Sequence, residues 1–96
     1  MRGAKKQTES SILSAVRQYL RLKGWFVIRI QQGLGCHKGI SDLIALKDGQ
    51  NTLWIEVKTE TGRLSEFQEW FQMDITNHGG TYVVVRSLED IRMMMG

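Results

Sequence analysis

The sequence has few of the features that cross-link a chain or carry it across a membrane. Its 96 residues include one cysteine and no proline. A lone cysteine excludes an intrachain disulfide and cannot by itself make a structural zinc site. No apolar run approaches the ~20 residues of a membrane-spanning helix, and there is no repeat or Pro/Ser-rich linker. These absences predict one soluble domain over residues 1–96, stabilised by packing, with no membrane partner.

The charge balance is weakly basic. A formal net charge of +3 and a pI near 9.3 favour a polyanionic partner, although many mildly basic proteins do not bind nucleic acid. The N-terminal stretch MRGAKKQTESS is polar and basic and lacks the apolar segment of a signal peptide, so a cytoplasmic location is expected. Charge alone leaves the function open.

Hydrophobic periodicity predicts the order helix, strand, strand, strand, helix, strand, helix, and hence an α/β fold with a mixed sheet flanked by helices. A first helix lies between Thr8 and Lys23, with Thr8 or Ser10 as its N-cap. Strands are predicted at about 25–30, 40–46, 52–58 and 81–85. The unbroken apolar run of the last strand indicates burial on both faces.

Two further helices are predicted from caps and apolar spacing. Ser65 begins the second helix, whose apolar face consists of Phe67, Trp70, Phe71 and Ile75. Ser87 begins a short last helix. Between the first two strands, the glycine-rich segment QQGLGCHKG is expected to be an irregular loop.

The stretch SDLIALKDGQNTLWIEVK is unusual, because two strands that enter a core also carry charged residues. Alternation along a strand places Glu56 and Lys58 on the same face. The length of the turn decides whether Asp42 joins them: a two-residue turn sets Asp42 opposite Ile55, whereas an odd turn sets it opposite Glu56. The polar run 47–51 favours a five-residue turn. We therefore predict that Asp42 and Glu56 are opposed.

Opposed residues in a hairpin have Cβ atoms ~4.5 to 5.5 Å apart, so two carboxylates there repel unless a cation lies between them. Mg²⁺ prefers a few carboxylate oxygens and keeps waters in the rest of its shell. Lys58 beside such a metal could orient or deprotonate an attacking water. The pattern predicts a metal-dependent hydrolytic site. The plainer alternative is a structural α/β domain with solvated surface charges.

The same residues resemble the signature of the PD-(D/E)xK nuclease superfamily: Asp42, thirteen residues, then Glu56-Val57-Lys58. The segments GISDLIAL, GRLSEFQEWF and GGTYVVVRSLEDI are similar to those of the virus-type replication-repair nuclease family, VRR-NUC. The resemblance runs from about Glu9 to Ile91 and is to the stand-alone members that phages encode. Ser41 stands where the superfamily name has proline, a residue without a chemical role.

The resemblance implies a restriction-endonuclease-like core that hydrolyses DNA phosphodiester bonds with Mg²⁺ or Mn²⁺. In that mechanism Asp42 and Glu56 hold one or two metal ions, the Val57 carbonyl is an extra ligand, and Lys58 positions the water.

Two helical residues join this site by the same resemblance. Glu9 corresponds to an acid of the first helix, which the resemblance implies is a ligand of a second metal or an outer-shell acid. Its position three and four residues before Ile12 and Leu13 places it at the edge of the apolar face. The alternative for Glu9 is a first-turn acid favoured by the helix dipole. Gln68 corresponds to a glutamine of the second helix, and its alternative is a capping box with Ser65.

The resemblance further implies a homodimer that cuts branched or structured DNA of the Holliday-junction type. A flap or general structure-specific endonuclease is the alternative among enzymes, and a catalytically silent DNA-binding module is the alternative of another class. Lys38 and Arg63 flank the hairpin and are candidates for contacts with DNA phosphates. Cys36 and His37 lack a second pair of ligands, so no metal or catalytic role is expected of them.

Overall fold

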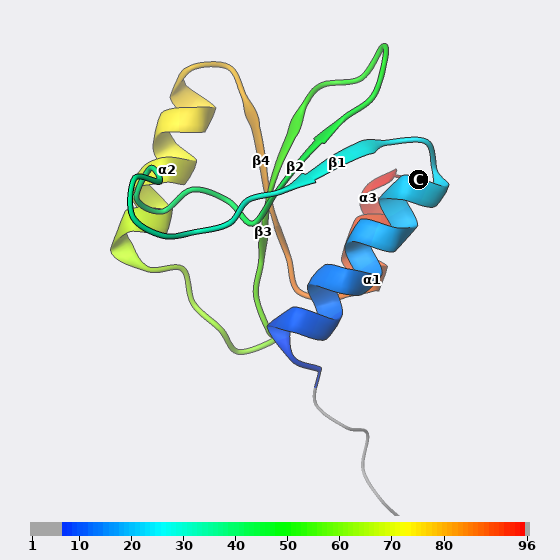
Figure 1. Ribbon diagram of the computed structural model, residues 1–96, viewed down its shortest axis with the longest axis horizontal. Coiled ribbons are helices and arrows are strands. Elements are labelled where there is room, and N and C mark those ends of the chain that lie inside the picture. Colours follow the sequence, from blue (N-terminus) through cyan, green and yellow to red (C-terminus); the bar gives the residue numbers. More distant parts are fainter. Residues whose placement is uncertain (1–6, 96) are drawn as a thin grey trace, which may run out of the picture.

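The computed structural model describes residues 7–95 and confirms the predicted order of elements (Figure 1). The helices are α1 (Glu9–Leu22), α2 (Glu66–Asn77) and α3 (Leu88–Met95), and the strands are β1 (Phe26–Arg29), β2 (Leu43–Leu46), β3 (Leu53–Val57) and β4 (Thr81–Val85). The fold is α/β, as predicted. No helix within the described part of the chain has the length and apolar character needed to cross a bilayer.

The four strands form one mixed sheet in the order β1-β2-β3-β4. Neighbours are antiparallel except β3 and β4, which run parallel and are connected through α2. Leu43 pairs with Ile55 and Ala45 with Leu53. This register leaves 47–51 as the turn, so the prediction of an odd, five-residue turn is confirmed. Asp42 directly precedes Leu43 and Glu56 directly follows Ile55, so the two acids are neighbours at this end of the hairpin.

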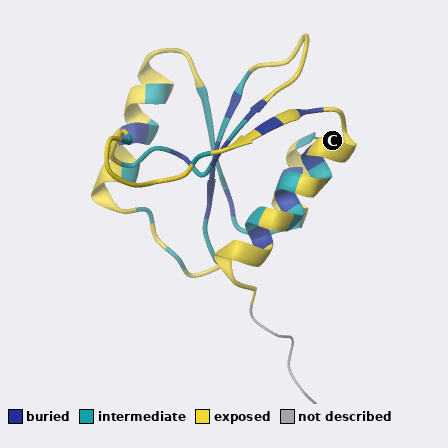
Figure 2. Ribbon diagram, in the orientation of Figure 1, coloured by how far each residue is buried: buried dark blue, intermediate teal, exposed yellow. Residues whose placement is uncertain are grey.

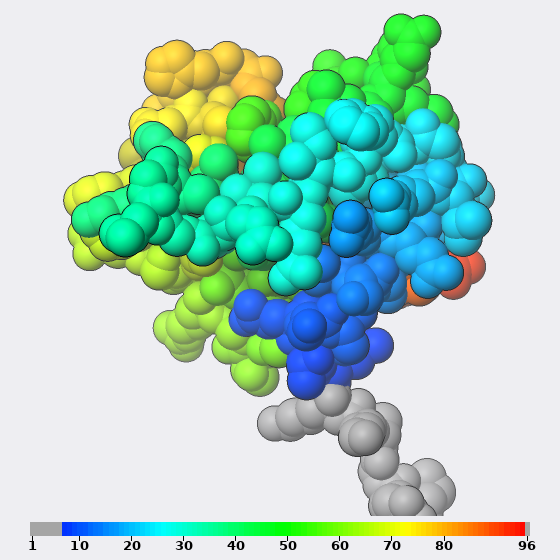
Figure 3. All heavy atoms as spheres, viewed as in Figure 1, coloured from blue at the N-terminus to red at the C-terminus, as the bar shows by residue number. Residues whose placement is uncertain are grey.

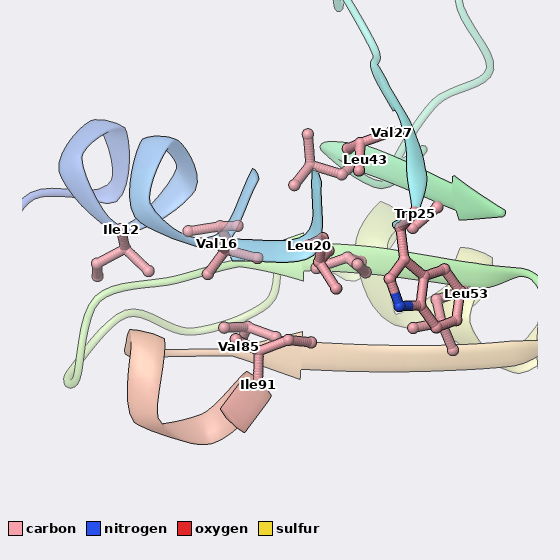
Figure 4. Close-up of a cluster of buried hydrophobic side chains, with 12 residues drawn as sticks. Ile12, Val16, Leu20, Trp25, Val27, Leu43, Leu53, Val85 and Ile91 are labelled. Carbon is pink, nitrogen blue, oxygen red and sulfur yellow. The ribbon is translucent and has the colours of Figure 1, made fainter. Parts of the chain in front are cut away.

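The two faces of the sheet are covered differently. In Figure 1, α1 and α3 lie together on one side of the strands and α2 lies on the other. Ile12, Val16 and Leu20 recur at helical spacing on α1 and point at the sheet, as Figure 4 shows. They pack with alternate strand residues and one residue of α3 in a single apolar core, which includes Trp25, Val27, Leu43, Ala45, Leu53, Ile55, Val57, Val85 and Ile91.

Local hydrogen bonds explain where the first elements begin. Thr8 is the N-cap of α1, and its hydroxyl accepts a hydrogen bond from the Ser11 N–H at 3.1 Å. β2 begins at Leu43, later than the predicted residue 40, because the Ile40 N–H donates to the His37 carbonyl in a turn at 3.1 Å. The chain therefore enters the sheet only after the irregular loop has closed.

Two predictions about burial are wrong. The prediction that the strand 81–85 is buried on both faces fails, since Val85 is the one fully buried residue of β4. β4 lies at the edge of the sheet and has a neighbouring strand on one side only. On α2, Phe71 is buried, whereas Phe67 and Trp70 are 46% and 55% exposed. The reason is that α2 reaches the sheet mainly through Phe71, whose ring meets those of Trp54 and Tyr82. Figure 2 accordingly shows most of α2 as exposed.

Candidate active site

Asp42 is held at the entrance to β2 by hydrogen bonds from both neighbouring strands. Its N–H donates to the Ile55 carbonyl at 3.0 Å, and its carbonyl accepts from the Ile30 N–H at 2.8 Å. Its carboxylate oxygen Oδ2 accepts a third bond, from the Val57 N–H at 2.8 Å. The position and direction of this carboxylate are therefore fixed by the sheet itself.

Glu56 lies on the α2-facing side of β3 and is only 1% exposed. Its Oε2 accepts a hydrogen bond from Gln68, and its Oε1 is buried without a partner among residues 7–95. The pKa of Glu56 is raised from 4.5 to about 8, chiefly by burial and next by the charge of Asp42, while the charge of Lys58 acts in the opposite direction. Glu56 therefore keeps its proton at neutral pH unless a cation joins the two acids.

Gln68 takes part in a capping box and also contacts Glu56. Its Oε1 accepts the Ser65 N–H at 2.8 Å, and the Ser65 hydroxyl accepts the Gln68 N–H at 3.2 Å, which is a capping box. Its Nε2 donates to Glu56 Oε2 at 3.2 Å. The cap therefore orients the amide so that its NH₂ group meets the buried acid.

Lys58 and Glu9 lie at the rim of this cluster. The Lys58 N–H donates to the Val85 carbonyl at 3.0 Å, which continues the pairing of β3 and β4, and the half-buried side chain lowers the pKa of Glu56. Glu9 is an exposed first residue of α1 whose charge raises that pKa slightly. Within residues 7–95 no three His, Cys, Asp or Glu side chains come close enough together to hold a metal, so the structure brings two carboxylates together rather than three.

Tyr82 belongs to the same surroundings and was missed by the sequence analysis. It pairs with Trp54 across β3 and β4, so it shares the face of Glu56. Its hydroxyl is buried and has no hydrogen-bond partner in the described part of the chain. Burial raises the pKa of Tyr82, and the charges of Glu56 and Asp42 add to the rise. The signal in the sequence is the alternation along TYVVV, which is informative only once the parallel register is known.

Arg86 was also missed, and it orders the loop that follows Lys58. Its guanidinium NH1 donates to the carbonyl oxygens of Thr59 and Gly62 at 2.8 and 2.6 Å. The signal that could have identified it is an arginine directly after an apolar strand. Arg86 thus connects β4 to the loop that follows the hairpin of β2 and β3.

The two candidate DNA contacts lie on the surface near α2. Lys38 is exposed, and its Nζ lies 4.9 Å from the centre of the Phe67 ring. Arg63 is exposed in the loop that leads to the Ser65 cap. Neither Cys36 nor His37 joins the acids: the Cys36 thiol donates to the Gln31 carbonyl, and the His37 ring packs 5.4 Å from that of Phe71.

A mixed sheet whose hairpin carries an aspartate opposite a Glu-x-Lys pair is the arrangement of nucleases of the PD-(D/E)xK type. The VRR-NUC domain matches residues 3–89, and the chain therefore belongs to the VRR-NUC family, nucleases of this type that act on DNA. A solved structure described as a VRR-NUC domain has the same fold, with a TM-score of 0.80 and 18% identity over 91% of this chain and 92% of that one. A comparison with curated proteins found no match.

Proposed function

We propose that this protein is a metal-dependent endonuclease that hydrolyses phosphodiester bonds in branched or structured DNA. The observation that carries the proposal is Glu56, a carboxylate 1% exposed with one oxygen lacking a partner among residues 7–95, opposite a second acid. Ionising this buried carboxyl without a partner costs several kcal/mol, roughly. A divalent cation between the two acids would remove that cost, so the residues fit a metal site.

Asp42 and Glu56 are the side chains that would hold Mg²⁺ or Mn²⁺, with the Val57 carbonyl as a further oxygen ligand. Both peptide groups of a strand residue face the same neighbouring strand in an antiparallel ladder, and the Val57 N–H already bonds to Asp42. The Val57 carbonyl therefore points toward Asp42 and β2, like the Val57 N–H. Glu9, at the rim, is suited to the outer shell. The ion would supply positive charge that polarises the phosphate and stabilises the transition state.

The other residues position these acids and the attacking water. Lys58, on the same face as Glu56, orients the attacking water and stabilises charge that develops on the phosphate. Gln68 holds Glu56 Oε2 and so directs Oε1 into the site. The Val57 N–H fixes Asp42 in the same way. Lys38 and Arg63 contact DNA phosphates on the α2 side.

The proposed substrate is a Holliday-junction-type structure cut by a homodimer in the cytoplasm. Two copies related by a twofold axis would present two identical sites to two strands of a junction. Support for this finer step comes from the family resemblance and from the small size of a domain with one catalytic hairpin.

The test is cleavage of labelled four-way junction, flap and linear duplex DNA in Mg²⁺ or Mn²⁺. We expect cleavage that needs metal and falls at least about 100-fold in Asp42→Asn and in Lys58→Ala. Asp48→Asn, in the exposed turn, and Lys23→Ala, at the end of α1, are matched controls that should cut like wild type.

The preferred substrate then decides between junction resolution and flap trimming. If wild type binds all three DNAs without cutting, and both active-site variants bind equally well, the protein is a DNA-binding module and the nuclease proposal is wrong.

A further inference from the structure

A groove of about 360 Å³ lies beside the candidate active site, between the irregular loop and the start of α2. The loop contributes Gln32, His37 and Lys38, and α2 with its cap contributes Ser65, Phe67 and Gln68. In Figure 3 the loop, cyan to green, lies against the yellow surface of α2. Its volume is near the lower end of the roughly 300–1,000 Å³ of small-ligand sites.

Close packing of the loop against α2 shapes this groove in advance. Gly39 has φ +79°, and a Cβ there would overlap the Phe67 carbonyl oxygen, so glycine is required for the approach. Gln32 Nε2 donates to the Ile40 carbonyl at 2.9 Å across the base of the loop. The His37 ring, 5.4 Å from that of Phe71, fixes the other side. The groove therefore does not need a ligand to form.

Phe67 lines the groove, and a second exposed aromatic side chain, Trp70, lies beside it on α2. Phe67 and Trp70 are one turn apart on α2, 46% and 55% exposed, with ring centres 5.9 Å apart. The Lys38 ammonium lies 4.9 Å from the centre of the Phe67 ring. Aromatic faces beside a cation are the surface that binds single-stranded nucleic acid, because bases stack on the rings and phosphates meet the charge.

The groove is continuous with the candidate active site through Gln68, which lines it and donates to Glu56. Glu66 and Glu69 begin the same helix, and their charge repels phosphates. The aromatic pair is therefore suited to an uncharged base, with the strand's phosphate on the Lys38 side. A base inside a duplex has both faces covered by its neighbours, so only an unpaired base can stack there.

We propose that this groove binds one unpaired nucleotide of the DNA strand, its base on Phe67 and Trp70 and its phosphate on Lys38, next to the phosphate that is cut. The inference rests on the proposed function for the path of the strand across Asp42 and Glu56. It names the substrate class more narrowly: DNA that offers an unpaired nucleotide beside the scissile bond.

The test is a binding measurement on a labelled flap DNA in which each unpaired nucleotide in turn is replaced by an abasic one, in Ca²⁺, which also binds carboxylate oxygens. Wild type should bind about 10-fold more weakly when the base is missing at one position, since stacking is worth ~1–3 kcal/mol per base. Phe67→Leu and Trp70→Leu should bind intact DNA more weakly by a similar factor and be insensitive to the abasic position. Phe26→Leu, at a more exposed aromatic on β1, should behave like wild type.

The abasic series needs no variant, so it tests the proposal even if a substitution disturbs folding. Equal wild-type affinity for every abasic DNA overturns the stacking site, whether or not the protein cleaves in Mg²⁺. A base-specific loss without any cleavage supports the groove and refutes the nuclease activity instead. If the two leucine variants break a homodimer in sedimentation and keep the abasic sensitivity, the aromatic pair is a contact between copies and the proposal is wrong.

Discussion

The two faces of β3 have opposite effects on the stability of the protein. Ile55 and Val57 are fully buried in the apolar core that α1 shares with the strands. Glu56 lies between them in sequence and is equally buried on the opposite face, yet one of its oxygens has no partner among the described residues. The apolar face supplies the rigidity with which the other face holds two acids close together. The comparison predicts that mutations in adjacent residues should change stability with opposite signs.

The largest expected effect comes from the apolar face. Ile55→Ala should lower the free energy of unfolding by about 2–5 kcal/mol, because it removes buried methylene groups and leaves a cavity. Denaturant titration measures it. Phe26→Ala, 67% exposed on β1, is the control and should change stability by less than about 1 kcal/mol. A loss under 1 kcal/mol for Ile55→Ala would show that this face is not the source of rigidity.

The opposite sign is expected at Glu56, and it depends on pH. The folded-state pKa of about 8 lies above the ordinary 4.5, so the folded protein keeps a proton that the unfolded chain has lost. Stability is therefore fully present below pH 4.5 and falls as pH rises toward 8, by up to about 5 kcal/mol at ~1.4 kcal/mol per pKa unit. Metal-free denaturation of wild type and Glu56→Gln at pH 4.5 and 8.5 measures it. The variant should lack this loss and be the more stable protein at pH 8.5, and equal slopes for the two would contradict the prediction.

Adding metal at pH 8 should reverse part of that loss. A ligand that binds the folded state at ten times its dissociation constant stabilises by about 1.4 kcal/mol. We expect Mg²⁺ or Mn²⁺ to raise the melting temperature of wild type and of Asp48→Asn. Asp42→Asn should not respond, because it removes one of the two carboxylates. A response of the same size in Asp42→Asn would place the bound ion elsewhere.

The geometry of the hairpin that carries Asp42 and Glu56 was predictable because it is local. The alternation along 53–58 and the length of the turn determine which residues oppose each other, and the register agrees. Caps at Thr8 and Ser65 follow from short-range patterns too. The roles of Glu9 and Lys58 stay predictions, since the structure places them at the rim and does not test their chemistry.

What sequence reasoning missed depends on contacts between distant segments. The apolar spacing of α2 predicted a face of four residues. Because α2 packs near the edge of the sheet, Phe71 is the one aromatic side chain of this helix that is buried against the strands. Phe67 and Trp70 stay exposed for that reason. Likewise, the parallel pairing of β3 with β4 sets the face of Tyr82, and no local pattern encodes that pairing.

Tyr82 gives the smallest predicted effect and sharpens the comparison furthest. Tyr82→Phe keeps the ring contact with Phe71 and removes a buried hydroxyl that has no partner within residues 7–95. If polar groups on this face lower stability as Glu56 does, the variant should gain up to about 1 kcal/mol in denaturant titration. Tyr19→Phe, on the half-buried side of α1, is the control. A loss of more than about 1 kcal/mol would mean that a buried water bonds the hydroxyl, and the face would then be better satisfied than its side chains indicate.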